Sequence, residues 1–138
     1  MKPWIHEGEE IYSIEQVPDG AVGFIYFVKN IYGYWYVGKK NLYSTVTKPP
    51  LKGQKRKRKF VNESNWLAYK SSNGSVKEWE DWEYESRIII NWAYTKKHLT
   101  YLETHALFNL NVLKDPNSLN SNILGKFFPG DIPDNDKN

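Results

Sequence analysis

Two short runs of β-branched and aromatic residues constrain the fold more than any other feature of the sequence. Residues 22–29 and residues 34–39 share this composition, and each run is too short to make a convincing helix. The intervening residues 30–33 include Asn30 and Gly33, which are typical of tight turns. The sequence therefore predicts two antiparallel strands joined as a hairpin.

A third strand and a long helix are predicted further along the chain. Residues 86–93 carry three consecutive isoleucines and predict a strand. Thr95 can cap the N-terminus of a helix over residues 96–114, which Asp115 and Pro116 end. The expected fold class is α+β, with a small mixed or antiparallel sheet of three strands flanked by helices.

The length of 138 residues is typical of one domain, and we expect a single domain over residues 1–138. The chain has no cysteine, which excludes disulfides and thiolate-bound metal sites. It has no apolar run of about 20 residues and no apolar N-terminal signal, so we expect a cytoplasmic protein without a membrane partner. The remaining regions are predicted as a polar lead-in (1–20), a long loop or late-forming helix (44–60), short helices (65–69 and 76–84) and a polar tail (129–138).

Positive charge is concentrated in one segment, residues 48–59. This segment holds seven of the 19 lysines and arginines and no acid, whereas the rest of the chain carries 12 basic and 16 acidic side chains. A single basic stretch in an otherwise mildly acidic protein favours contact with a polyanion. The alternatives are a solvated flexible loop and a localisation signal. Nearby aromatic residues offer stacking partners for bases, namely Tyr43, Phe60, Trp66 and Tyr69.

The predicted long helix carries a glutamate inside its apolar stripe. At about 100° per residue, Glu103 falls about 40° from Leu99, among apolar residues that recur at helical spacing. Burial of an unpaired carboxylate costs several kcal/mol, so Glu103 must pair, protonate or bind a cation. Three interpretations stay open: a structural ion pair with a residue such as Arg87, a position at the end of the stripe that reaches water, and a metal ligand in a cleft.

Two tyrosines, Tyr26 and Tyr36, lie on the two strands of the predicted hairpin. Cross-strand partners share a face of a sheet. The two tyrosine side chains therefore point the same way only if the two residue numbers of each cross-strand pair add up to an even number. A slip of one residue would separate them. On their own, two tyrosines on aromatic strands are more often core residues than catalytic ones.

Taken together, these residues resemble the GIY-YIG nuclease family. Residues 23–26, Gly-Phe-Ile-Tyr, match its first signature element, and residues 36–38, Tyr-Val-Gly, match its second. Glu103 lies on a later helix where the family keeps a metal-binding glutamate, and Asn120 or Asn122 follows where it keeps an asparagine. More narrowly, the order of motifs from about residue 22 to residue 128 is similar to the Seg-like branch of stand-alone phage homing-type endonucleases.

The resemblance implies an endonuclease that hydrolyses phosphodiester bonds of double-stranded DNA with a divalent metal, magnesium. By the same resemblance, Glu103 would hold the ion, Tyr26 would act as general base toward the attacking water or orient it, and Tyr36 would share that network. Asn120 is the first choice for the family asparagine. The family arginine that stabilises developing negative charge is missing at its usual place, so Arg58 or a neighbouring cation of the basic segment is the implied substitute.

The predicted DNA contacts are basic residues. Lys39 and Lys40 end the second strand and are predicted phosphate contacts, with ordinary strand-edge charges as the alternative. The basic segment supplies the others, namely Lys55, Arg56, Lys57, Arg58 and Lys59. Two other functions stay open: a non-catalytic nucleic-acid-binding module that uses the basic loop and aromatic stacking, and a small interaction protein.

Overall fold

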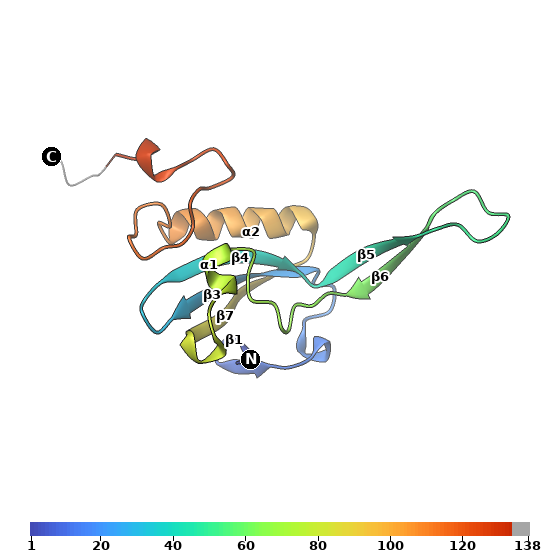
Figure 1. Cartoon of the computed structure of the whole chain (residues 1–138), viewed down its shortest axis with the longest axis horizontal. Coiled ribbons are helices and arrows are strands. Elements are labelled where there is room, and N and C mark those ends of the chain that lie inside the picture. The colour runs from blue at the N-terminus through green and yellow to red at the C-terminus, as the bar shows by residue number, and fades with distance from the viewer. Residues whose placement is uncertain (134–138) are drawn as a thin grey trace.

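A mixed sheet of five strands forms the centre of the structure, a computed structural model that describes residues 1–133 (Figure 1). The strands are β1 (Trp4–His6), β2 (Glu9–Ile11), β3 (Gly23–Asn30), β4 (Trp35–Asn41) and β7 (Tyr84–Ala93). They lie in the order β2, β1, β7, β3, β4, so β4 is an edge strand. β1 and β7 are parallel and meet at Ile5 and Ile88, whereas the other pairs are antiparallel.

The helix α2 (Lys96–Asn109) lies along one face of this sheet (Figure 1). The Thr95 side chain caps it by accepting a hydrogen bond from the backbone N–H of His98 at 2.9 Å. Successive strand residues alternate between the two faces, so the odd-numbered residues of β3 and β4 face α2. The core on this side includes Ile25, Val37, Ala93, Leu99, Ala106 and Leu107.

The opposite face of the sheet holds a second core, rich in aromatic rings. Residues 64–83, which cover this core, contain only short elements, α1 (Gly74–Lys77) and the 3-10 turn η2 (Asp81–Glu83). Asn73 caps α1 through its side-chain oxygen. The N-terminal 3-10 turn η1 (Ile14–Gln16) precedes β3 in the chain. The second core includes Trp4, Phe24, Tyr26, Trp66, Trp79 and Tyr84.

Strands β5 (Tyr43–Lys48) and β6 (Arg58–Glu63) form a separate hairpin that projects beyond the sheet, with residues 49–57 as its tip (Figure 1). The prediction of a loop or late-forming helix over residues 44–60 was therefore wrong for residues 44–48 and 58–60, which are strands, whereas residues 49–57 do form a loop. The prolines and the glycine that suggested irregular structure all lie in the tip. Neither face of the hairpin is buried, so no alternation of apolar and polar residues marks its strands.

The α+β class and the central hairpin of β3 and β4 agree with the sequence prediction, but a sheet of three strands was wrong. The two additional strands, β1 and β2, lie in the predicted polar lead-in, where Trp4 and Ile11 are buried. Each has only three residues, which is too short to leave a recognisable period. The pairing of β1 with β7 also joins residues that are far apart in the sequence.

The helices are shorter than the sequence predicts. Residues 65–69 form turns, and α1 and η2 replace the helix predicted over residues 76–84. α2 ends at Asn109, because Leu110 is the C-cap and Asn111 adopts a left-handed φ of 53°. The predicted tail starts with the 3-10 turn η3 (Pro129–Asp131), and its residues 134–138 lie outside the described residues. None of the described helices is long and apolar enough to cross a membrane.

Candidate active site

The register of β3 and β4 brings the two tyrosines to the same face of the sheet. Tyr26 pairs with Gly38, and Val28 pairs with Tyr36, so the paired numbers have the even sum that a shared face requires. The centroids of the two tyrosine rings are 6.2 Å apart. Both side chains lie on the face opposite α2.

The signature glycines make room for this arrangement. A Cβ atom on Gly38 would stand 2.6 Å from Cζ of Tyr26, so the Tyr26 ring can lie over β4 only because residue 38 has no side chain. A Cβ atom on Gly23 would stand 2.9 Å from Cδ2 of Leu99, so that glycine allows α2 to approach the other face of β3.

Two consecutive serines hold the hydroxyls of the tyrosines. The Tyr26 hydroxyl shares a hydrogen bond of 3.0 Å with Oγ of Ser71, and the Tyr36 hydroxyl shares one of 3.3 Å with Oγ of Ser72. Ser71 is buried and also accepts a hydrogen bond from the backbone N–H of Asn73. Sequence reasoning did not single out these serines as site residues, because a Ser-Ser-Asn run before a helix is an ordinary turn and cap signal.

Burial keeps both tyrosines in the neutral phenol form at neutral pH. It raises the pKa of Tyr26 far above its ordinary value, more than the hydrogen bond from Ser71 lowers it. Burial also raises the pKa of Tyr36, and the nearby Glu103 carboxylate raises it further. Tyr26 has no exposed surface, whereas Tyr36 is only half-buried. Tyr36 is therefore the tyrosine of this pair that faces solvent.

Glu103 projects from α2 toward β4. Its side chain is 21% exposed, and Oε1 lies 3.9 Å from Nζ of Lys39, which also donates a hydrogen bond of 3.2 Å to Thr100. Burial raises the pKa of the Glu103 carboxyl, and Lys39 opposes this by lowering it. β4 is the edge strand, with Tyr36 on one face and Lys39 on the other. Gly38 lies between them in sequence, directly after Val37, whose backbone Asn120 contacts.

Glu103 does form an ion pair, but with Lys39 and not with Arg87, the residue suggested from the sequence. The guanidinium of Arg87 lies on the opposite face of the sheet, 3.8 Å from the ring centroid of Trp4. It donates hydrogen bonds to three backbone carbonyls instead, and thereby connects the N-terminus to the segment that covers the second core. The acceptors are the carbonyl oxygens of Lys2, Leu67 and Tyr69, at 2.7 to 2.9 Å.

Asn120 lies beside β4 as well. Its Oδ1 accepts a hydrogen bond from the backbone N–H of Val37 at 3.0 Å, and its Nδ2 donates one to the Val37 carbonyl at 2.8 Å. The amide thus takes the place of one residue of a neighbouring strand at the sheet edge. Asn122, the other candidate from the sequence, accepts a hydrogen bond from the backbone N–H of Gly125. Of the two, Asn120 contacts the strand that carries Tyr36.

The basic residues fall into two groups. Lys39 contacts Glu103, and Nζ of Lys40 lies 4.1 Å from the ring centroid of Tyr69, whose ring packs against Tyr26 with centroids 6.0 Å apart. The other group lies on the projecting hairpin (Figure 1), with Lys55, Arg56 and Lys57 in its tip and Arg58 and Lys59 on β6. Arg58 donates a hydrogen bond of 3.2 Å to the Pro49 carbonyl and lies near the Phe60 ring. Among the described residues, it makes no contact with Tyr26, Tyr36 or Glu103.

The surroundings of Glu103 are compatible with a metal ion that the protein and the substrate phosphate would bind together. In the described part of the chain, no group of three or more histidine, cysteine, aspartate or glutamate side chains could hold a metal. A complete protein cage is therefore not formed there. Magnesium commonly binds through one or two carboxylates and completes its coordination with waters and substrate phosphates. One half-buried carboxylate beside the edge strand β4 fits that mode of binding.

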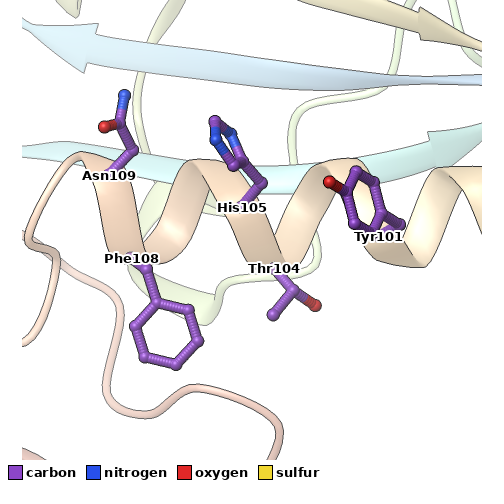
Figure 2. A pocket seen from close by; sticks show the side chains of 5 residues that line it. All are labelled: Tyr101, Thr104, His105, Phe108 and Asn109. Atoms are coloured by element: carbon purple, nitrogen blue, oxygen red, sulfur yellow. The ribbon is translucent and has the colours of Figure 1, made fainter.

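A shallow pocket on α2 is separate from this group of residues. Figure 2 shows the side chains that line it, all on the helix: Tyr101, Thr104, His105, Phe108 and Asn109. Its lining is mainly apolar and does not include Glu103. At about 100° per residue, Glu103 lies on the other side of the helix from these residues. The pocket therefore lies apart from Tyr36, Lys39 and Glu103, the side chains around Gly38.

Comparison with known protein families gives one match. Residues 4–123 match a family model whose description reads "Putative endonuclease segE, GIY-YIG domain". The matched range includes both tyrosines, Glu103 and Asn120, and also β1 and β2. No curated protein and no solved structure gave a significant match.

Proposed function

The chain belongs to this segE GIY-YIG family, and on that premise we propose that it is a magnesium-dependent endonuclease that hydrolyses phosphodiester bonds of double-stranded DNA. We further propose that it acts as a homing-type or phage nuclease, because the matching family is the segE branch. One observation carries the proposal. A half-buried carboxylate, a tyrosine hydroxyl and two lysines lie around Gly38 on the two faces of the edge strand β4.

Glu103 is the residue that would hold the divalent ion. The ion, when bound, would polarise the scissile phosphate and stabilise the leaving oxygen. The carboxylate suits this role because its only ion-pair partner among the described residues, Lys39, is 3.9 Å away. Lys39 in turn keeps a positive charge next to the phosphate.

The two tyrosines take different parts in the proposed reaction. Tyr36 is half-buried and neutral, and its hydroxyl would orient the attacking water by hydrogen bonding. Tyr26 has no exposed surface, so we assign it a positioning role rather than that of the base. Its ring packs against Tyr36, and its hydroxyl holds Ser71, which immediately precedes the Ser72 partner of Tyr36.

The remaining residues predicted from the sequence have supporting roles in the proposed reaction. Asn120 would position Tyr36 by holding the backbone of Val37 next to it. Lys39 and Lys40, rather than Arg58, are the cations close enough to stabilise negative charge as it develops on the phosphate. Arg58 and the other basic residues of the hairpin would bind the DNA backbone at a distance from the cleaved bond.

Incubation with supercoiled plasmid tests the function directly. We expect nicked or linear plasmid in the presence of magnesium and intact plasmid in the presence of a chelator. Cleavage that persists with chelator would contradict the metal dependence. Binding of duplex DNA without cleavage in any divalent metal would instead favour the non-catalytic nucleic-acid-binding module.

Charge reversal in the hairpin tip should weaken DNA binding and its dependence on salt. We expect the variant with Lys55→Glu, Arg56→Glu and Lys57→Glu to bind all duplex sequences more weakly. The slope of log affinity against log salt should fall by about 2.7, because each lost phosphate contact contributes about 0.9. Titration of a labelled duplex at several salt concentrations measures both effects.

A second variant controls for net charge. Lys77, Lys97 and Lys126 are exposed and lie outside the hairpin, so reversing these three changes the total charge equally. We expect this control to retain most of the salt slope. Equal losses in the two variants would show that overall charge, rather than the hairpin, determines binding.

A further inference from the structure

A groove lies where the β5 and β6 hairpin leaves the sheet. It has a volume of about 470 Å³ and is lined by residues from β4, β5, β6 and the first residue of α2. Lys40 lines it from β4 and Lys96 from the start of α2, and Ser44 and Thr45 line it from β5. The groove therefore forms only when the hairpin, the sheet and the helix are assembled.

The chemistry of the groove suits an anion. It contains two lysines and several hydroxyl groups, and no acidic side chain is among its lining residues. Neither Lys40 nor Lys96 has an ion-pair partner among the described residues. The hydroxyls of Ser44 and Thr45 likewise make no hydrogen bond within the described chain. Ammonium groups without an ion-pair partner and hydroxyls without a hydrogen bond are available to a bound phosphate.

The position of the groove connects the two DNA-binding regions. On one side, Lys40 lies over Tyr69, whose ring packs against Tyr26. On the other side, β5 and β6 lead outward to the basic tip. A DNA strand that contacts both the candidate active site and the tip must cross the root of the hairpin. The groove lies on that path.

We propose that this groove binds a backbone phosphate of DNA next to the cleaved bond, with Lys96 and Lys40 as its cations and the Thr45 hydroxyl as a hydrogen-bond donor. This inference rests on the proposed function, because it names how the same site holds its substrate. It adds Lys96, which is neither one of the residues around Tyr26 and Tyr36 nor part of the hairpin of β5 and β6. Because it contacts only the backbone, the subsite makes the same contribution to every DNA sequence.

Single substitutions of neighbouring lysines test the proposal. Lys96→Ala removes the groove lysine, whereas Lys97→Ala removes an exposed lysine one residue further along α2 that does not line the groove. Affinity for a random-sequence duplex is measured against salt concentration in chelator, so that cleavage does not interfere. We expect Lys96→Ala to lower the salt slope by about 0.9, Lys97→Ala to leave it unchanged, and Lys96→Arg to restore it.

The outcomes separate this inference from the nuclease proposal. If Lys96→Ala and Lys97→Ala have equal salt slopes in a protein that nicks plasmid, the proposed phosphate subsite is contradicted and the proposed nuclease activity is not. A lower slope for Lys96→Ala alone, in a protein that never nicks plasmid, would support the subsite and overturn the nuclease. If both hold, Lys96→Ala should also raise KM for DNA with kcat unchanged, because the lost contact is the same in the ground state and the transition state.

Discussion

Replacement of Glu103 by alanine should abolish DNA cleavage and leave the protein folded. We expect activity to fall by about 10²- to 10³-fold or more, because the variant loses the carboxylate that would hold the metal beside Tyr36. The free energy of unfolding should change by less than about 1 kcal/mol, because the Lys39 partner is 41% exposed and such pairs contribute little. Plasmid nicking and thermal melting of the same preparation measure the two effects.

Glu85 provides a matched control for this variant. Glu85 also forms an ion pair with a lysine of the sheet, Lys29, at 3.5 Å. Neither of these residues belongs to the candidate active site. We expect Glu85→Ala to nick plasmid at the rate of the unsubstituted protein. If Glu103→Ala nicked as fast as this control, Glu103 would have no part in the mechanism. A loss of stability by about 3 to 5 kcal/mol would instead indicate a structural ion pair.

The pH dependence of stability gives an independent view of the same carboxyl group. Burial raises the pKa of Glu103 in the folded protein above its ordinary value of 4.5, so folding favours the protonated form. This contribution to stability is complete below pH 4.5 and is lost as the pH rises through the higher folded value. Glu103→Gln cannot titrate. We therefore expect its stability relative to the unsubstituted protein to increase from acid to neutral pH, which denaturant unfolding at several pH values would measure.

The sequence predicted the parts of the site that local pattern determines. The aromatic runs of β3 and β4 specified a hairpin, whereas the sequence left open whether Tyr26 and Tyr36 share a face, and the register of the hairpin places them on one face. The helical stripe marked Glu103 as a carboxylate among apolar residues, and in the structure its side chain is 21% exposed and paired with Lys39. Each of these inferences depends on periodicity within a few residues of the site, which is the information that a single sequence carries best.

Contacts between distant segments were not predictable in the same way. Ser71 meets Tyr26 across 45 residues, and Arg87 meets Lys2 across 85 residues. Nothing in the local sequence marks either pair, since a serine in a turn and an arginine on a strand are both ordinary surface residues. The exposed strands β5 and β6 gave no signal either, because they bury no face. The family resemblance implied Arg58 or a neighbouring cation in place of the missing family arginine, whereas Lys39 and Lys40 are the cations that lie beside Glu103 and Tyr69.

Replacement of Gly38 by alanine should disable the site and destabilise the fold. The new methyl group would overlap the Tyr26 ring, with Cζ at 2.6 Å. That ring has no exposed surface and is surrounded by aromatic neighbours, so it cannot move aside freely. We expect a loss of about 1 to 3 kcal/mol in the free energy of unfolding, as for other overpacked cores. Nicking should fall as well, because Tyr36 packs against the displaced ring.

A double-mutant cycle tests whether the overlap with Tyr26 is the cause. Gly74→Ala serves as the control, because a methyl group there meets nothing within 4 Å. Tyr26→Leu removes the aromatic ring, including the Cζ atom and the hydroxyl oxygen that lie closest to the new methyl group. If the overlap is responsible, Gly38→Ala should cost less stability in the Tyr26→Leu protein than in the unsubstituted one. An equal cost in both backgrounds would mean that the glycine serves the backbone of β4 itself, and the tyrosine would then not explain why residue 38 is glycine.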